Sequence, residues 1–102
     1  MADAQFELPE IAAGSDIPEV VLYWDVNFGG ASFRTNLNYS YIGDQWNDQT
    51  SSIVVVSGQW QFYRDANFQT PVGGPLGPGY YKWVEDVGIP NDCISSFRCV
   101  AP

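Results

Sequence analysis

A six-residue pattern occurs twice in this chain, and it constrains the fold more than any other feature. The copies are Asn47–Ser52 (NDQTSS) and Asn91–Ser96 (NDCISS), which share Asn, Asp and both serines. Each copy leads into a largely apolar run, Ile53–Val56 or Phe97–Val100. Oxygen-bearing side chains are therefore gathered in a loop that a following strand can hold in place. Oxygen ligands of this kind suit hard cations such as Ca²⁺.

A second pair of matches shows that the pattern belongs to a duplicated unit. Tyr23–Phe28 (YWDVNF) and Tyr63–Phe68 (YRDANF) share Tyr, Asp, Asn and Phe at an offset of 40 residues. The six-residue patterns are 44 residues apart, so the second copy carries a short insertion. A repeat at a fixed period defines one structural unit. The chain therefore consists of two units of about forty residues.

Composition favours an all-β domain. The 102 residues suffice for one domain with a single core. Aromatic residues make up 16%, and the 10 glycines and 7 prolines favour short strands and tight turns. No window keeps the apolar period of a helix over ten residues. We expect strands at Val20–Trp24, Ala31–Thr35, Ser52–Ser57, Trp60–Arg64 and Phe97–Val100, with Gly58 between the halves.

One segment breaks the repeat. Where the second half needs a returning strand, Thr70–Gly79 reads TPVGGPLGPG. Proline cannot donate to a strand ladder, and glycine weakens one. We expect a short, edge-located or bulged strand there.

Charge and hydropathy exclude several partners. The net charge is −8, and only four cationic side chains could meet phosphates, which argues against nucleic acid. Five of the twelve acids lie in the first nineteen residues, so residues 1–18 read as an acidic extension, either flexible or loosely docked. We see neither a membrane span nor a secretory signal. The compartment stays open, and we expect a monomer.

The two cysteines are not expected to form a disulfide. A predicted strand separates Cys93 from Cys99, which puts them roughly 20 Å apart if extended, whereas a disulfide needs Cα atoms within about 7 Å. Alternation makes Cys99 a small buried hydrophobic residue, and it leaves Cys93 in an exposed loop. The chain has no histidine, which removes Cys-His metal sites and the usual Ser-His and Cys-His catalytic pairs.

These motifs resemble the βγ-crystallin domain of the microbial, calcium-binding type. The resemblance rests on the turn residues Tyr23, Phe28 and Gly30, on Ser57-Gly58-Gln59-Trp60, and on both six-residue patterns, and it runs from about Val20 to Val100. It implies a sandwich of two Greek-key motifs, at about 19–58 and 59–102. Thr70 stands where the second turn motif would carry glycine, which puts the geometry of that hairpin in question.

The resemblance also implies two calcium sites that share the two loops. Asp48 and Asp92 would be side-chain ligands, whereas Ser51 and Ser95 would each reach across to the other ion. Asn47 and Asn91 would contribute main-chain oxygen, and a further backbone carbonyl would come from the residue after the strand tyrosine, which is Trp24 or Arg64. Ser52 and Ser96 are expected to bond to the folded hairpin instead.

The chemistry of these residues fits that implication. Calcium accepts six to eight oxygens without strict geometry. With roughly one carboxylate for each site, and with Arg64 beside one of them, we expect micromolar to sub-millimolar affinity. Because the ions bind only the folded state, calcium would stabilise the domain.

Other interpretations remain open at this stage. Asn, Asp and Ser in loops also serve simply as turn and capping residues. A binding or inhibitory module, with the exposed loop Thr70–Gly79 engaging a protease or a glycan, is the competing class. Trp24, Trp46, Trp60 and Trp83 are expected to belong to the core rather than to a sugar-stacking platform. Glu85 and Asp86 are expected to be solvated strand neighbours, and no enzymatic activity is expected.

Overall fold

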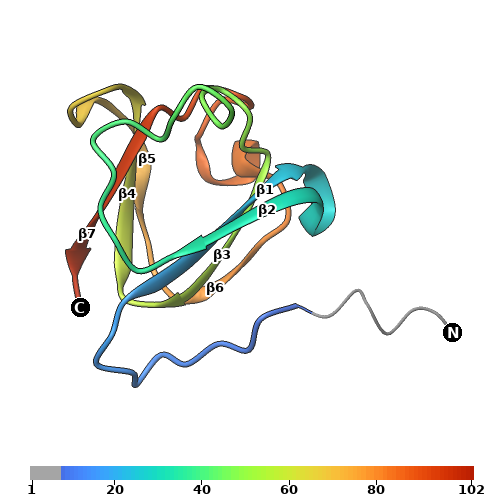
Figure 1. Cartoon of the computed structure of the whole chain (residues 1–102). Helices are drawn as coiled ribbons and strands as arrows, with labels where there is room; N and C mark the ends of the chain where they lie inside the picture. Colours follow the sequence, from blue (N-terminus) through green and yellow to red (C-terminus); the bar gives the residue numbers. More distant parts are fainter. Residues whose placement is uncertain (1–7) are drawn as a thin grey trace, which may run out of the picture.

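The chain folds into two antiparallel sheets packed face to face, as the computed structural model of residues 8–102 shows (Figure 1). The first sheet has the strand order β2-β1-β3-β6, and the second has the order β5-β4-β7. Two short 3₁₀ segments, η2 (Val26–Phe28) and η3 (Val84–Val87), complete the elements. The strands are β1 (Glu19–Asp25), β2 (Gly29–Thr35), β3 (Ser52–Ser57), β4 (Gln59–Asp65), β5 (Gln69–Leu76), β6 (Gly79–Tyr81) and β7 (Ser96–Ala101).

The two halves exchange one segment each. Strand β6 comes from the second half but pairs with β3 of the first, through Ile53–Tyr81 and Val55–Gly79. In return, Tyr39 of the first half forms an antiparallel bridge with Phe97 in β7. Each sheet is therefore built from both halves, which is the Greek-key arrangement that the family resemblance implied. Within residues 8–102, no helix is long and apolar enough to cross a membrane.

Strand alternation places the core between the sheets. Val20 and Leu22 of β1 point inward and are fully buried, as are Trp60 and Phe62 of β4. Phe97 of β7 packs against the rings of both Trp60 and Phe62. Full burial of side chains of this size contributes about 2–3 kcal/mol each. The predicted all-β sandwich is confirmed.

The outer face of the first sheet is also covered. Val21, Tyr23, Val54 and Val56 form a second apolar cluster there, against which Ile11 packs. The chain before β1 reaches this cluster through one backbone hydrogen bond, from the N–H of Ala12 to the carbonyl of Val56, at 2.8 Å. The acidic extension predicted for residues 1–18 is described only from residue 8 onward.

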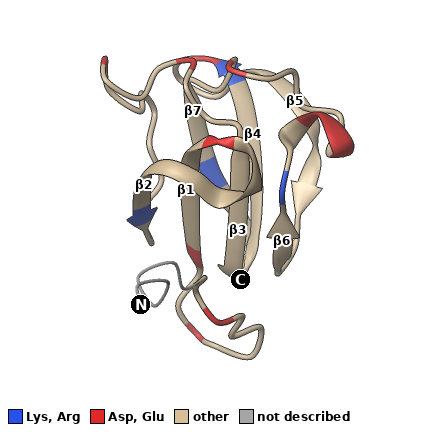
Figure 2. Cartoon of the chain, turned by 90° about the vertical axis from the view of Figure 1, so that its right-hand side faces the viewer, with Lys and Arg blue, Asp and Glu red and all other residues tan. Residues whose placement is uncertain are grey.

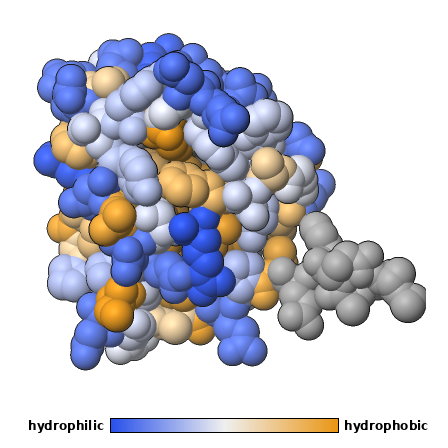
Figure 3. Space-filling model, viewed as in Figure 1, coloured by the Kyte–Doolittle hydropathy of each residue, from blue (hydrophilic) through white to orange (hydrophobic). Residues whose placement is uncertain are grey.

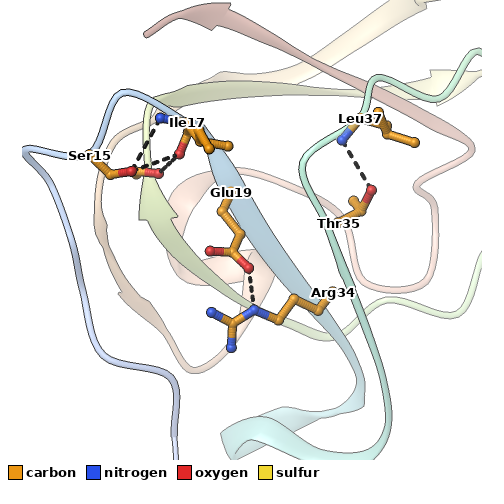
Figure 4. Close-up of polar contacts among 7 residues, drawn as sticks. Ser15, Ile17, Glu19, Arg34, Thr35 and Leu37 are labelled. Carbon is orange, nitrogen blue, oxygen red and sulfur yellow. Dashed lines mark hydrogen bonds and ion pairs between the residues drawn. The ribbon is translucent and has the colours of Figure 1, made fainter.

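The entry into β1 is fixed by local polar contacts (Figure 4). The Ser15 hydroxyl accepts a hydrogen bond from the backbone N–H of Ile17 at 3.1 Å. Glu19 and Arg34 form an ion pair across β1 and β2.

Figure 3 shows hydrophobic residues scattered among hydrophilic ones on the face seen in Figure 1. The acidic positions coloured in Figure 2 fall mainly in loops and in η3.

Most of the Gly/Pro-rich segment lies in one long strand. Strand β5 has eight residues, lies at the edge of the second sheet and has a bulge opposite Trp60/Phe62. The edge location and the bulge were expected, but the predicted short length is wrong. The side-chain amide of Gln61 lies 3.1 Å from the carbonyl oxygens of both Val72 and Gly73 and donates to them. This contact holds β5 where its own ladder is weak.

Two expectations about individual side chains are wrong. Cys93 is buried and belongs to the inner core, whereas Cys99 is only half-buried; both thiols are free. Burial raises the pKa of the Cys93 thiol, and the Asp48 and Asp92 carboxylates add to that rise against the opposing charge of Arg64. The polar loop around Cys93 therefore turns this side chain inward.

The second wrong expectation is that all four tryptophans belong to the core. Trp60 is fully buried, but Trp24 is 41% and Trp83 is 39% exposed. These two side chains do not belong to the core. Trp24 lies near the end of β1 and Trp83 directly before η3, and both are open to solvent.

Candidate metal centre

Two loops face each other at one end of the sandwich. Loop 1 is Asn47–Ser52 and loop 2 is Asn91–Ser96, the two copies of the six-residue pattern. The N–H of Asp48 donates to the carbonyl of Ile94 at 3.1 Å, and the N–H of Asp92 donates to that of Thr50 at 3.3 Å. The second residue of each loop thus donates to the carbonyl of the fourth residue of the other loop. The two loops are therefore related by an approximate twofold axis.

The backbone turns sharply at the second residue of each loop. Asp48 has φ of 60° and Asp92 has φ of 58°, in the left-handed region. Asp and Asn reach this conformation more easily than most residues, which explains why they stand here. Both carboxylates are left at the exposed tip of their loop.

The fifth residue of each loop crosses to the other loop. The Ser51 hydroxyl donates to a carboxylate oxygen of Asp92 at 3.3 Å. The Ser95 hydroxyl donates to the side-chain oxygen of Asn47. Both serines were expected to reach across, and the structure brings each to the opposite loop. The two contacts differ, because one partner is a carboxylate and the other is an amide.

The last two predicted residues, Trp24 and Arg64, each follow a strand tyrosine whose carbonyl bonds to a loop. The N–H of Ser51 donates to the carbonyl of Tyr23 at 2.8 Å, and the N–H of Ser95 donates to that of Tyr63 at 2.9 Å. Trp24 therefore stands beside Ser51, and Arg64 beside Ser95. Among the described strands, neither Trp24 nor Arg64 is paired with a residue of a neighbouring strand.

The eight predicted residues thus gather in two groups. We call Trp24, Ser51, Asn91 and Asp92 group A, and Arg64, Ser95, Asn47 and Asp48 group B. Each group contains one Asp carboxylate, one Ser hydroxyl, one Asn that is expected to contribute its main-chain oxygen, and a strand-end carbonyl. These are all oxygen donors of the kind that Ca²⁺ accepts.

The sixth residue of each loop has a different role. The Ser52 hydroxyl donates to the carbonyl of Asp25 at 2.6 Å and accepts from the N–H of Phe28 at 3.0 Å. Ser96 makes the same pair of bonds with Asp65 and Phe68, at 2.6 and 3.2 Å. The expectation that these serines bond to the folded hairpins is confirmed.

Glu85 was missed as a neighbour of the site. It lies in η3 rather than in a strand, and its carboxylate accepts a hydrogen bond from the backbone N–H of Asn91 at 3.1 Å. At the equivalent place in loop 1, the N–H of Asn47 donates to the carbonyl of Gly43 at 2.8 Å. At this place group A therefore has a second carboxylate, whereas group B has a backbone carbonyl. The sequence carried no signal for this contact except an acid six residues before loop 2.

Comparison with known proteins settles the family. The family model described as Beta/Gamma crystallin matches residues 19–100. The chain belongs to the βγ-crystallin family. A curated "Beta/gamma-crystallin" from Ciona intestinalis is 33% identical over 81 residues, which are 78% of this chain and 95% of that protein.

Solved βγ-crystallins agree with this assignment. A βγ-crystallin from an archaeon is 45% identical, with a TM-score of 0.77, and the match covers 83% of this chain and all of that one (100%). A βγ-crystallin from Methanosaeta thermophila, described as transition-metal-ion-binding, is 29% identical with a TM-score of 0.68; the match covers 79% of this chain and 99% of that one.

Proposed function

We propose that this βγ-crystallin binds two calcium ions, one at group A and one at group B, and that the ions stabilise the fold. The observation that carries the proposal is the reciprocal crossing of Ser51 and Ser95 between the two loops. This crossing brings a hydroxyl of one half to the acid or amide of the other. An ion at either group would link the two halves of the domain. We assign no enzymatic activity to it.

The donor set favours calcium over a transition metal. Imidazole and thiolate are the ligands that hold zinc and its neighbours in the periodic table. This chain has no histidine, and Cys93 is turned into the core. Within residues 8–102, no three His, Cys, Asp or Glu side chains are placed to hold a metal together. Backbone, hydroxyl and amide oxygens must therefore complete each site, and these are hard ligands.

The two sites should differ in affinity. Group A has Asp92 with the Glu85 carboxylate nearby, whereas group B contains Arg64, whose positive charge opposes a cation. Ligand charge is one of the terms that set calcium affinity. We expect both dissociation constants between about 1 μM and 1 mM, with group A the tighter.

Thermal unfolding tests the central claim. Calcium in about hundredfold excess over its dissociation constant should stabilise the fold by about 2.7 kcal/mol for each site. The melting temperature of the chain should therefore be higher in calcium than in EGTA, while magnesium should give a smaller rise. An unchanged melting temperature would contradict calcium-linked stabilisation.

Calorimetric titration of variants tests the shared arrangement. Two binding events are expected, and both Asp48→Ala and Asp92→Ala should weaken both of them, although unequally, because the loops bond to each other. Arg64→Ala should strengthen the weaker event. Arg34→Ala removes the same charge from β2 and serves as the matched control. Two sites that respond independently would refute the crossing arrangement.

A further inference from the structure

A hollow on the surface lies outside both groups. It is lined by Val26 and Asn27 from η2 and by Lys82, Trp83 and Asp86 in and before η3. Its frame is held by backbone bonds, since the N–H of Asn27 donates to the carbonyl of Lys82 at 2.8 Å. Val84, which follows Trp83, is fully buried and anchors the segment. The hollow is therefore a fixed feature of the fold.

The hollow presents an aromatic ring with polar side chains around it. Trp83 is 39% and Val26 is 43% exposed. Lys82 and Asp86 take part in no ion pair within residues 8–102, where the one such pair joins Arg34 to Glu19. The lining thus offers a cation, an anion and the Asn27 amide, each free to bond to a ligand.

We propose that this hollow binds a neutral saccharide, with one pyranose ring stacked on Trp83. An anionic ligand would meet Asp86, and a cationic ligand would meet Lys82. A purely apolar ligand would remove three polar groups from water without replacing their hydrogen bonds, which is unfavourable. A sugar ring has an apolar face for the indole, and its hydroxyls both donate and accept. Ligand sites commonly combine aromatic surface with a few convergent polar groups in this way.

The duplicated half provides an internal control. Tyr41 occupies the position of Trp83 in the first repeat and is 43% exposed. Its hydroxyl donates to the Asp44 carboxylate at 2.6 Å, so the acid that corresponds to Asp86 is already engaged. Ser40 and Ala66 stand in place of Lys82 and Val26. This side keeps Asn67 in place of Asn27 but lacks the cation and the free carboxylate, and we expect no sugar binding there.

Ligand-observed and protein-observed NMR on the full chain test the proposal. Maltotriose, cellotriose and N,N′,N″-triacetylchitotriose serve as neutral probes, and sialyllactose serves as the charged one. Each is added up to about 10 mM, so that a dissociation constant of about 1 mM is detected. At least one neutral probe should show saturation transfer and shift the Trp83 indole N–H. Trp83→Ala should weaken that binding about tenfold or more, because it removes the apolar surface on which the sugar ring stacks.

Matched variants make the outcome decisive. Tyr41→Ala should leave binding unchanged, and Trp83→Phe should retain most of it. Asp92→Ala should bind the sugar as the unchanged chain does, so failure of the calcium proposal is separable from failure of this one. The proposal is overturned if no neutral probe binds, if Trp83→Ala binds as well as the original chain, or if sialyllactose binds better than the neutral probes.

Discussion

The two halves build the same hairpin with different residues. In the first hairpin, Gly30 has φ of 73°, and a Cβ there would lie 2.7 Å from a carboxylate oxygen of Asp25. In the second, Thr70 has φ of 57°, and its hydroxyl donates to the carboxylate of Asp65 at 2.8 Å. A side chain at Gly30 would crowd the acid of its hairpin, whereas the side chain of Thr70 is hydrogen-bonded to the matching acid. The repeat therefore preserves the backbone path, and the contacts that support it can change.

The serine hydrogen bonds that both hairpins share should contribute the most to the stability of the chain. Ser52→Ala and Ser96→Ala each remove two hydrogen bonds from a fully buried hydroxyl. Unpaired buried backbone groups cost about 1–3 kcal/mol, so each change should lower the free energy of unfolding by about 3 kcal/mol. Urea denaturation in EGTA measures the loss without any contribution from calcium. The two losses should agree within about 1 kcal/mol, and a larger gap would mean that the hairpins are not equivalent.

The turn glycine should give the next largest effect. Gly30→Ala places a Cβ at positive φ against Asp25 and should destabilise the chain by about 2 kcal/mol. Thr70→Gly removes a β-branched residue from the same conformation but loses one exposed hydrogen bond, and it should stabilise by about 0.5 kcal/mol. Opposite signs for the two changes are the expected result in urea denaturation. If Thr70→Gly is clearly destabilising, the threonine contact dominates its backbone strain.

The repeat explains how much the sequence could predict. The period placed both hairpins and both loops, and it located β3 at Ser52–Ser57, because alternation and turn residues are local signals. The orientation of Cys93 and the exposure of Trp83 depend on packing between distant segments, so local patterns misplaced them. The Glu85 contact depends on η3 forming a 3₁₀ turn where a strand was expected.

The outer faces of the halves offer a further contrast. Val21 of β1 lies in an apolar cluster under Ile11, whereas Gln61 occupies the equivalent place in β4 and holds β5. Gln61→Ala should destabilise by about 1.5 kcal/mol, since carbonyls of β5 lose their donor. Hydrogen exchange should show faster opening of β5 than of β2 in this variant. Uniform exchange across both edge strands would contradict a local role for Gln61.

The smallest predicted effect concerns one position inside the loops. Thr50 in loop 1 corresponds to Ile94 in loop 2, and both side chains are fully buried. The Thr50 hydroxyl has no hydrogen-bond partner within residues 8–102. A buried hydroxyl without a partner is unfavourable, and the apolar residue at the matching position shows that the site accepts a hydrocarbon. Thr50→Val keeps the shape and should stabilise the chain by about 1 kcal/mol in urea denaturation. Ile94→Val, which removes one methylene, is the control and should destabilise by about 1 kcal/mol. If Thr50→Val is destabilising, the hydroxyl has a partner such as a bound water, and the two loops differ in how they are hydrated.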